Sequence, residues 1–250
     1  SEFEEGIEKQ EFQVFYQPVV DAKTGKIVSA EALVRWFHEQ KGFISPGQFI
    51  PALEKGGYIS ELDRYMIEKV TGCLDQRRAE KKRFVPVSVN LSWMDFYDEN
   101  MLEWIVRGLK KNNPNEQKIR FEITETSLAA IGENHTRMLM HLKENGAEIL
   151  LDDFGSGYSS FGMLQDYDFD ILKMDISFVR NIGVNKKSES ILRAIIDMAH
   201  QLEIRLVAEG AETEEQVAFL RANGCDYIQG YYYYKPMPEN EFLQLLDEGK

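Results

Sequence analysis

Short runs of β-branched and aromatic residues alternate along the chain with longer stretches in which apolar residues recur every three or four positions. The short runs predict β-strands and the longer stretches predict amphipathic helices, so the pattern indicates repeated βα units. Eight runs predict strands: Phe12–Val20, Val28–Trp36, Phe84–Leu91, Ile119–Thr124, Glu148–Asp152, Phe169–Lys173, Ile204–Ala208 and Asp226–Gln229. Helical patterns fill most of the intervals, for example Ser60–Arg78, Glu133–Asn145, Ser188–Gln201 and Thr213–Asn223.

Eight strands that alternate with helices favour an α/β fold of the TIM-like (β/α)8 barrel type over an open sheet. The first connection is an exception, because only residues 21–27 separate the first two strands. A parallel crossover needs about a dozen residues, so we expect an antiparallel first strand pair. One such barrel uses roughly 250 residues, and no linker, repeat or low-complexity tract divides the chain. We therefore expect residues 1–250 to form a single domain.

The helix that follows Thr213 has the clearest predicted boundaries. A threonine at this position can cap the first turn, and Glu215 places a negative charge near the helix N-terminus. The pair Asn223-Gly224 is a typical stop signal. We expect the helix to begin and end at these residues.

The composition narrows the classes of function. Basic and acidic side chains number 29 and 42, which leaves a formal charge of −13, while 43% of the residues are hydrophobic and 12% aromatic. Such a chain can bury a sizeable core, so disordered and fibrous classes are excluded. An acidic surface repels nucleic-acid backbones, and no nucleic acid polymer is expected as a partner. An anionic substrate would need metal ions.

Cysteine use and hydropathy bear on the compartment. Cys73 and Cys225 lie far apart and outside any CxxC motif, so neither a disulfide framework nor a cysteine-based zinc site is supported. No apolar run approaches the roughly 18 to 20 residues of a membrane span, and the N-terminus lacks the features of a signal peptide. We expect a cytoplasmic domain without membrane contact. Because the chain opens without Met, we expect it to be excised from a longer protein.

Polar residues lie at or just after the ends of most predicted strands. In a TIM-like barrel the C-terminal strand ends build the active site. The residues concerned are Glu31, Asn90, Glu122, Glu125, Asp152, Asp153, Lys173, Asp175, Glu209 and Gln229. Any one of them could simply cap a helix or begin a turn. Five or six carboxylates at one barrel mouth, however, would repel one another unless cations were present, so together they predict a metal site.

Oxygen ligands without His or Cys favour Mg²⁺ or Mn²⁺ over zinc. The adjacent carboxylates of Asp152 and Asp153 could each serve one of two metal ions, and two ions can clamp the attacking and leaving oxygens in phosphodiester hydrolysis. Lys173 could position or help deprotonate the attacking water. It could equally form a structural ion pair with Asp175 or Glu209, and the residues alone leave both readings open.

A series of motifs resembles the EAL domain family, bacterial phosphodiesterases that open cyclic di-GMP to linear pGpG. The resemblance covers nearly the whole chain. Its motifs are FYQPVVD at 15–21, EALVRW at 31–36, SPGQFIP at 45–51, VNLS at 89–92, EITET at 122–126, DDFGSGYSS at 152–160, LKMDISFV at 172–179, AEGAET at 208–213 and QGYYYYKPMP at 229–238. These motifs follow the order and spacing of the family.

The resemblance implies roles for individual residues. One metal ion would be bound by Glu31, Asn90, Glu122 and Asp152. A second ion would be bound by Asp152, Asp153 and Glu209, so the two ions would share Asp152. Lys173 corresponds to the family lysine that contacts the catalytic water, and Glu209 matches a residue that has also been assigned as general base. Together with Glu31 and Glu125 they form the implied catalytic set.

Other residues are implied to act around the metal ligands. Glu125 and Glu212 match carboxylates that support the metal site from behind, and Glu125 could accept hydrogen bonds from the loop after Asp153. The residues that match positions near the substrate are Gln17, Leu33, Arg35 and Gln229. The guanidinium of Arg35 suits a phosphate oxygen, whereas Leu33 could equally be barrel packing.

The resemblance implies metal-dependent hydrolysis of cyclic di-GMP to linear 5′-pGpG by attack of a metal-bound water. It also implies a bacterial homodimer whose full-length protein carries sensory or GGDEF-type domains and could be membrane-anchored. Two alternatives stay open: a catalytically silent receptor for cyclic di-GMP, and a barrel enzyme for another phosphodiester. Receptors of this family usually lose metal ligands, and every implied ligand is present here.

Overall fold

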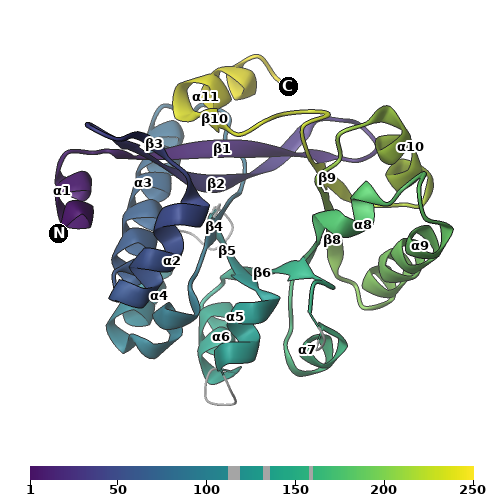
Figure 1. The fold of residues 1–250 in the computed structure, drawn as a ribbon, viewed down its shortest axis with the longest axis horizontal. Helices are drawn as coiled ribbons and strands as arrows, with labels where there is room; N and C mark the ends of the chain where they lie inside the picture. The colour runs from purple at the N-terminus through teal and green to yellow at the C-terminus, as the bar shows by residue number, and fades with distance from the viewer. Residues whose placement is uncertain (112–118, 132–135, 158–159) are drawn as a thin grey trace.

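The computed structural model describes residues 1–111, 119–131, 136–157 and 160–250, and Figure 1 shows helices arranged around a sheet of strands. The strands are β1 Phe12–Asp21, β2 Ile27–His38, β3 Gly42–Ile44, β4 Val87–Asn90, β5 Ile119–Thr124, β6 Glu148–Phe154, β7 Ile171–Met174, β8 Arg205–Glu209, β9 Tyr227–Gln229 and β10 Met237–Pro238. The helices are α1 Glu2–Glu8, α2 Pro46–Gly56, α3 Ile59–Ala79, the 3-10 helix η1 Trp93–Tyr97, α4 Glu99–Lys111, α5 Glu125–Ile131, α6 Thr136–Glu144, α7 Ser160–Asp166, α8 Ile176–Arg180, α9 Lys186–Gln201, α10 Glu214–Ala222 and α11 Glu239–Asp247. Among these described helices, none has the length and apolar character needed to cross a membrane.

The strands close into a barrel. They follow the order β1-β9-β8-β7-β6-β5-β4-β2, and β2 pairs again with β1 to complete the ring. Strand β1 is antiparallel to both of its barrel neighbours, whereas the pairs from β2 through β9 are parallel. The TIM-like barrel and the antiparallel first pair are therefore both confirmed. The short strands β3 and β10, which the pattern did not predict, extend the sheet beside β2 and β1.

The first hairpin is short because Asp21 organises a tight turn. Its carboxylate Oδ1 accepts hydrogen bonds from the backbone N–H groups of Lys23 and Thr24, and Gly25 adopts a positive φ of 71°. Such a turn reverses the chain directly, so no crossover helix is formed.

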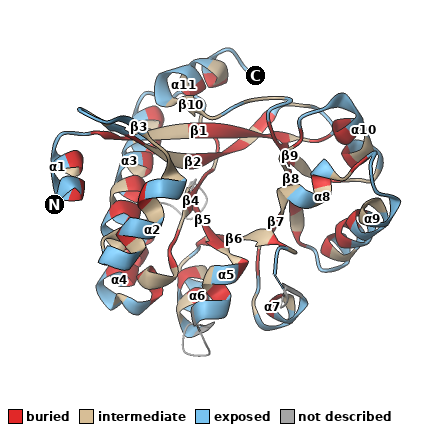
Figure 2. Ribbon diagram, viewed as in Figure 1, coloured by how far each residue is buried: buried red, intermediate tan, exposed pale blue. Residues whose placement is uncertain are grey.

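Side chains that point into the barrel form layers, because alternate residues of a strand face the same side. Arg120, Glu148 and Arg205 form ion pairs at the N-terminal ends of their strands. Two positions further along lies an apolar layer of Val19, Leu150, Ile171 and Val207. Two positions after Leu150, Ile171 and Val207, the same inward phase places Asp152, Lys173 and Glu209 at the barrel mouth. Glu122, two positions after Arg120, joins them there. Figure 2 shows buried residues along the strands and exposed residues on the outer helix faces.

Most predicted boundaries agree with the structure. Helix α10 is capped by Thr213, whose side chain accepts from the N–H of Gln216, and it ends at Asn223 as expected. Strand β4 is shorter than predicted and starts at Val87, after Pro86, a residue that has no N–H for the sheet. Of the helix predicted over Glu133–Asn145, residues 133–135 lie outside the described residues.

Candidate active site

Lys173 lies at the centre of the acidic cluster in the barrel mouth. Its side chain is 2% exposed, and its Nζ is 2.6 Å from Glu122 Oε2 and 2.8 Å from Glu209 Oε1. The same atom is 3.1 Å from Glu31 Oε2 and 3.3 Å from Asp152 Oδ1. The four carboxylates come from β2, β5, β6 and β8, so barrel closure is what brings them around one ammonium group.

Asp175, the other ion-pair partner considered for Lys173, has a different contact. Its carboxylate accepts a hydrogen bond of 2.9 Å from the N–H of Ser177 and caps α8. Of the two partners considered, the structure therefore pairs Lys173 with Glu209.

The cluster carries more negative charge than one lysine can balance. Burial disfavours the charged form of Lys173, but the carboxylates, Asp152 and Glu122 foremost, outweigh it and raise the pKa of the lysine well above its usual value. Burial also raises the pKa of Glu122 well above normal and that of Glu209 to about 8. These shifts indicate a site that takes up protons or cations.

Glu31 is held in its charged form by three donors. Burial works against the carboxylate, but Lys173, Gln229 and Asn90 outweigh it, so the pKa of Glu31 is lowered. Gln229 Nε2 donates to Glu31 Oε2 at 2.7 Å, and Asn90 Nδ2 donates to Glu31 Oε1 at 3.3 Å.

The residues present fit a hard divalent cation. Asp152, Asp153 and Glu209 each offer one carboxylate oxygen, and these oxygens lie within 4.8 Å of one another. Among the described residues, buried Glu122 Oε1 has no hydrogen-bond partner. A buried carboxylate oxygen without a donor is costly unless a cation satisfies it. The donor set consists of oxygen, which suits Mg²⁺ or Mn²⁺.

A β-bulge allows Asp152 and Asp153 to serve the same mouth. The register between β6 and β7 shifts between Leu151 and Phe154, and Asp153 has a φ of +56°. Neighbouring residues of a regular strand face opposite sides, and a bulge re-aims one of them. Asp is among the few residues besides Gly that tolerate this backbone region.

Glu125 contacts the backbone of the loop that follows β6. Its Oε2 accepts hydrogen bonds from the N–H groups of Gly155 at 3.2 Å and Gly157 at 3.3 Å, and the residue is 2% exposed. A Cβ on Gly157 would lie 2.7 Å from Glu125 Oε1, so any larger residue there would displace the Glu125 carboxylate. Residues 158–159 of the same loop lie outside the described residues. The role of Glu125 in metal binding stays a prediction.

A cavity of about 300 Å³ opens beside the acidic cluster. Its lining includes Gln17, Leu33 and Gln229, three of the four residues predicted on the substrate side, together with the exposed Glu212. Arg35 instead borders an adjoining cavity of about 110 Å³, which shares Leu33 with the first.

The cavity beside the cluster also contains residues outside the predicted set of site residues. They are Ile176, Arg180, Gly210, Gly230 and Tyr231. Ile176 and Arg180 belong to α8, directly after the strand that carries Lys173. Their position directly after a strand that carries a site residue is the sequence feature that could have predicted them.

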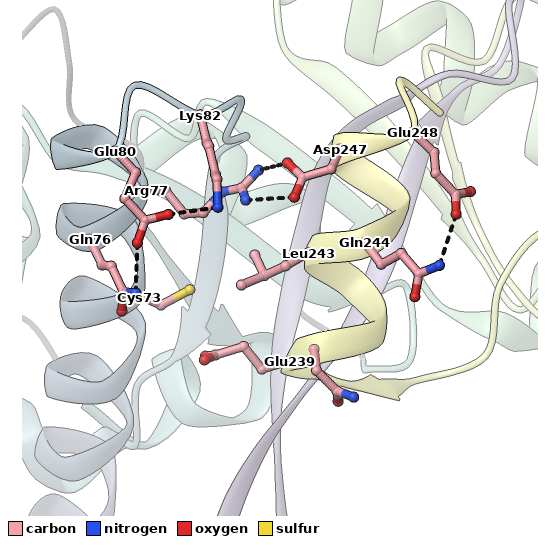
Figure 3. Close-up of a pocket in the computed structure, with 11 residues that line it drawn as sticks. Cys73, Gln76, Arg77, Glu80, Lys82, Glu239, Leu243, Gln244, Asp247 and Glu248 are labelled. Carbon is pink, nitrogen blue, oxygen red and sulfur yellow. Dashed lines mark hydrogen bonds and ion pairs between the residues drawn. The ribbon is translucent and has the colours of Figure 1, made fainter.

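A larger cavity of about 590 Å³ lies between α3 and α11. Figure 3 shows several of its polar side chains paired with each other, including Arg77 with Asp247 and Lys82 with Glu80. It contains none of the residues of the acidic cluster. It is a groove between two helices, and it does not compete with the barrel mouth as the active site.

Comparisons with known proteins identify the family of this chain. The EAL domain profile matches residues 1–236. The cyclic di-GMP phosphodiesterase PA2567 of Pseudomonas aeruginosa is 36% identical over 228 residues, which cover 90% of this chain and 38% of that protein. The probable cyclic di-GMP phosphodiesterase PdeG of Escherichia coli is 32% identical over 240 residues, 96% of this chain and 47% of that protein. The chain thus spans less than half the length of these relatives.

Solved structures give the same result. The cyclic di-GMP complex of the PaMucR phosphodiesterase superposes with a TM-score of 0.86 at 31% identity, covering 96% of this chain and 98% of that chain. The EAL enzyme Bd1971, in its form with cAMP and cyclic di-GMP bound, gives a TM-score of 0.87 at 30% identity over 98% of this chain and 67% of that chain. From the profile match, the relatives and these neighbours together, the chain belongs to the EAL domain family.

Proposed function

We propose that this domain is a metal-dependent phosphodiesterase that hydrolyses cyclic di-GMP to linear 5′-pGpG. The observation that carries the proposal is the ring of four carboxylates around the buried Lys173 beside a cavity, in a member of the EAL family. Relatives named as cyclic di-GMP phosphodiesterases support the substrate.

The metal ligands follow the sequence analysis. One ion would be held by Glu31, Asn90, Glu122 and Asp152, and the second by Asp152, Asp153 and Glu209. Bound Mg²⁺ or Mn²⁺ would supply a lowered water pKa and charge neutralisation at the phosphoryl group.

The protein's own residues would bind the substrate and handle protons. Hydrolysis adds water across one P–O3′ bond: the water oxygen joins phosphorus, and the leaving 3′ oxygen gains a proton. Lys173 Nζ is placed to orient the attacking water among the carboxylates. Burial raises the pKa of Glu209 to about 8 in the absence of a cation. Its carboxylate would stay ionised beside a bound metal ion, so that Glu209 would serve as a ligand or, in a site with one metal, as general base. Gln17, Leu33 and Gln229 would contact the nucleotide, and Arg35 a phosphate oxygen.

The proposal extends to the whole protein. Because the chain spans less than half the length of these relatives, we propose that residues 1–250 are one domain of a longer protein with sensory or GGDEF-type domains. We propose that this domain lies in the bacterial cytoplasm. Other parts of the full-length protein could anchor it to a membrane.

Product analysis tests the function. The purified domain is incubated with cyclic di-GMP and either Mg²⁺ or Mn²⁺, and the nucleotides are separated by anion exchange, with cyclic di-AMP and an EDTA sample as controls. We expect linear pGpG from cyclic di-GMP when Mg²⁺ or Mn²⁺ is present, no product from cyclic di-AMP, and no product from either nucleotide with EDTA. Binding of cyclic di-GMP without product would instead identify the silent receptor, and preferred hydrolysis of cyclic di-AMP would identify a different substrate.

A further inference from the structure

Helix α8 packs against the two loops that directly follow the strands with the acidic ligands. The side chain of Ile176 occupies the space where Gly210 lacks a Cβ, since a Cβ there would lie 2.1 Å from Ile176 Cγ1. Phe178 fills the matching space at Gly155, where a Cβ would lie 2.6 Å from the phenyl ring. Both glycines also have positive φ angles, of 71° and 90°. The helix is therefore held against the loops that follow β8 and β6.

Arg180 is the last residue of α8, and it lines the cavity beside the acidic cluster. The residue is exposed, and its guanidinium forms no ion pair or hydrogen bond with another residue in the described part of the chain. A position near the helix C-terminus favours a cation in general, but does not explain why the cation should line this cavity. The packing of α8 against the two loops therefore holds Arg180 at the edge of the cavity, where no described residue pairs with its guanidinium.

The electrostatics of the cavity require such a cation. The chain has a net charge of −13, and four carboxylates surround Lys173 at the floor of the site. A cyclic dinucleotide brings two phosphates, and in the proposed reaction the one being cleaved would lie over the acidic cluster and the metals it would hold. The other phosphate needs a separate cation, because an acidic surface repels it. A guanidinium suits phosphate oxygens because it can donate two parallel hydrogen bonds.

We propose that Arg180 binds the phosphate of the cyclic dinucleotide that is not being cleaved. It is thus a positioning and specificity residue: it favours substrates with a second phosphodiester and takes no part in bond cleavage. Arg35, on β2 beside Leu33, lies on a different wall of the site, so the two arginines would hold the nucleotide from two sides. This inference rests on the function proposed above.

The test compares Arg180→Gln and Arg180→Lys with Arg107→Gln, a matched control for loss of charge on the exposed face of α4. Loss of a charge-assisted hydrogen bond is expected to raise KM for cyclic di-GMP by about 10- to 100-fold. We expect kcat of Arg180→Gln to stay within about twofold of wild type, and Arg180→Lys to recover much of the affinity. Added salt should raise the KM of wild type more than that of Arg180→Gln, because one phosphate contact has been removed.

Several outcomes would overturn the inference. The first is a KM of Arg180→Gln equal to that of Arg107→Gln. The second is an Arg180→Gln variant that loses kcat but keeps the wild-type KM. The third is a KM of Arg180→Gln that rises with salt as much as the KM of wild type. If wild type binds cyclic di-GMP but releases no product, the proposed activity fails, and the ratio of dissociation constants for the same variants decides the role of Arg180. If wild type neither binds nor hydrolyses the nucleotide, both proposals are wrong. Equal melting temperatures of the variants would show that a KM effect does not come from misfolding.

Discussion

Lys173 balances part of the charge of four carboxylates, so its removal has two consequences. We predict that Lys173→Ala lowers kcat by two orders of magnitude or more and changes substrate binding by only a few fold, because its proposed role is at the attacking water. Removing one partner of a buried ion pair also costs about 3 to 5 kcal/mol, so the metal-free variant should melt at a lower temperature. Stopped-time assays, binding titrations and melting curves with and without Mn²⁺ measure these effects. Equal losses in turnover and binding would assign Lys173 to substrate binding instead.

Glu31 connects the predicted metal ligands to the substrate side. Its carboxylate accepts hydrogen bonds from Lys173, Gln229 and Asn90. We predict that Glu31→Ala abolishes detectable pGpG formation while circular dichroism still reports a folded barrel, because one ligand and one negative charge are removed. Wild-type turnover of this variant in saturating Mn²⁺ would contradict the assignment of Glu31 as a ligand.

At the scale of elements, the loop after β6 depends on a carboxylate from another strand end. Glu125 accepts from the backbone N–H groups of Gly155 and Gly157, close in sequence to Asp153. We predict that Glu125→Ala lowers activity and weakens Mn²⁺ affinity by about 10- to 100-fold, the usual effect of losing a residue that orients a ligand. Titrations of Mn²⁺ activation for wild type and variant measure this. Coincident curves with equal maximal rates would leave Glu125 no role in the site.

A second pair of carboxyls joins α3 to η1. Asp63 and Asp95 are buried, and each accepts a hydrogen bond from the N–H of Ser92, at 3.0 and 2.9 Å. Burial, and then the neighbouring charge of Asp95, raise the pKa of Asp63 well above its usual value. The folded protein therefore keeps a proton that the unfolded chain releases above about pH 4. This contribution to stability is complete below that pH and is lost as the pH rises through the folded pKa.

Replacing Asp63 by Asn supplies a permanent donor in place of that proton. We predict that Asp63→Asn melts at a higher temperature than wild type at pH 8 and that the difference shrinks at pH 5. Asp75→Asn, an exposed change on the same helix, is the control. A melting difference that is constant across this pH range would show that the proton on Asp63 does not contribute to stability.

At the scale of the whole molecule, exposed apolar side chains on α6 and α7 favour association. Met140 on α6 and Phe161 on α7 are 56% and 68% exposed, and an apolar cavity of about 320 Å³ lies between these helices, bordered by Tyr167 and Phe169. Exposed apolar side chains of this size often belong to interfaces. We predict a homodimer whose association and metal occupancy depend on each other. Light scattering with Mn²⁺ and with EDTA measures both, and a monomer of equal mass in the two conditions would contradict the prediction.

The sequence alone determined the eight strands of the barrel and most of the helices between them. Short runs of β-branched and aromatic residues identify the strands. Alternation along a strand then places Asp152 and Glu209 on the barrel interior, two residues after the inward-facing Leu150 and Val207. The short interval before β2 determined the antiparallel pair, because a parallel crossover does not fit in it. These features are local, since strand phase and turn length depend on neighbours in the chain.

Tertiary structure decided the contacts between distant strands. The set of carboxylates around Lys173 depends on register across the closed barrel, and the approach of Asp152 to Asp153 depends on a bulge with a positive φ. Arg180 reaches the cavity only because Gly155 and Gly210 admit α8 against two loops. The pattern of residues along the chain does not contain these distances. They arise only when strands from separate parts of the sequence close the barrel and their side chains pack in the same interior.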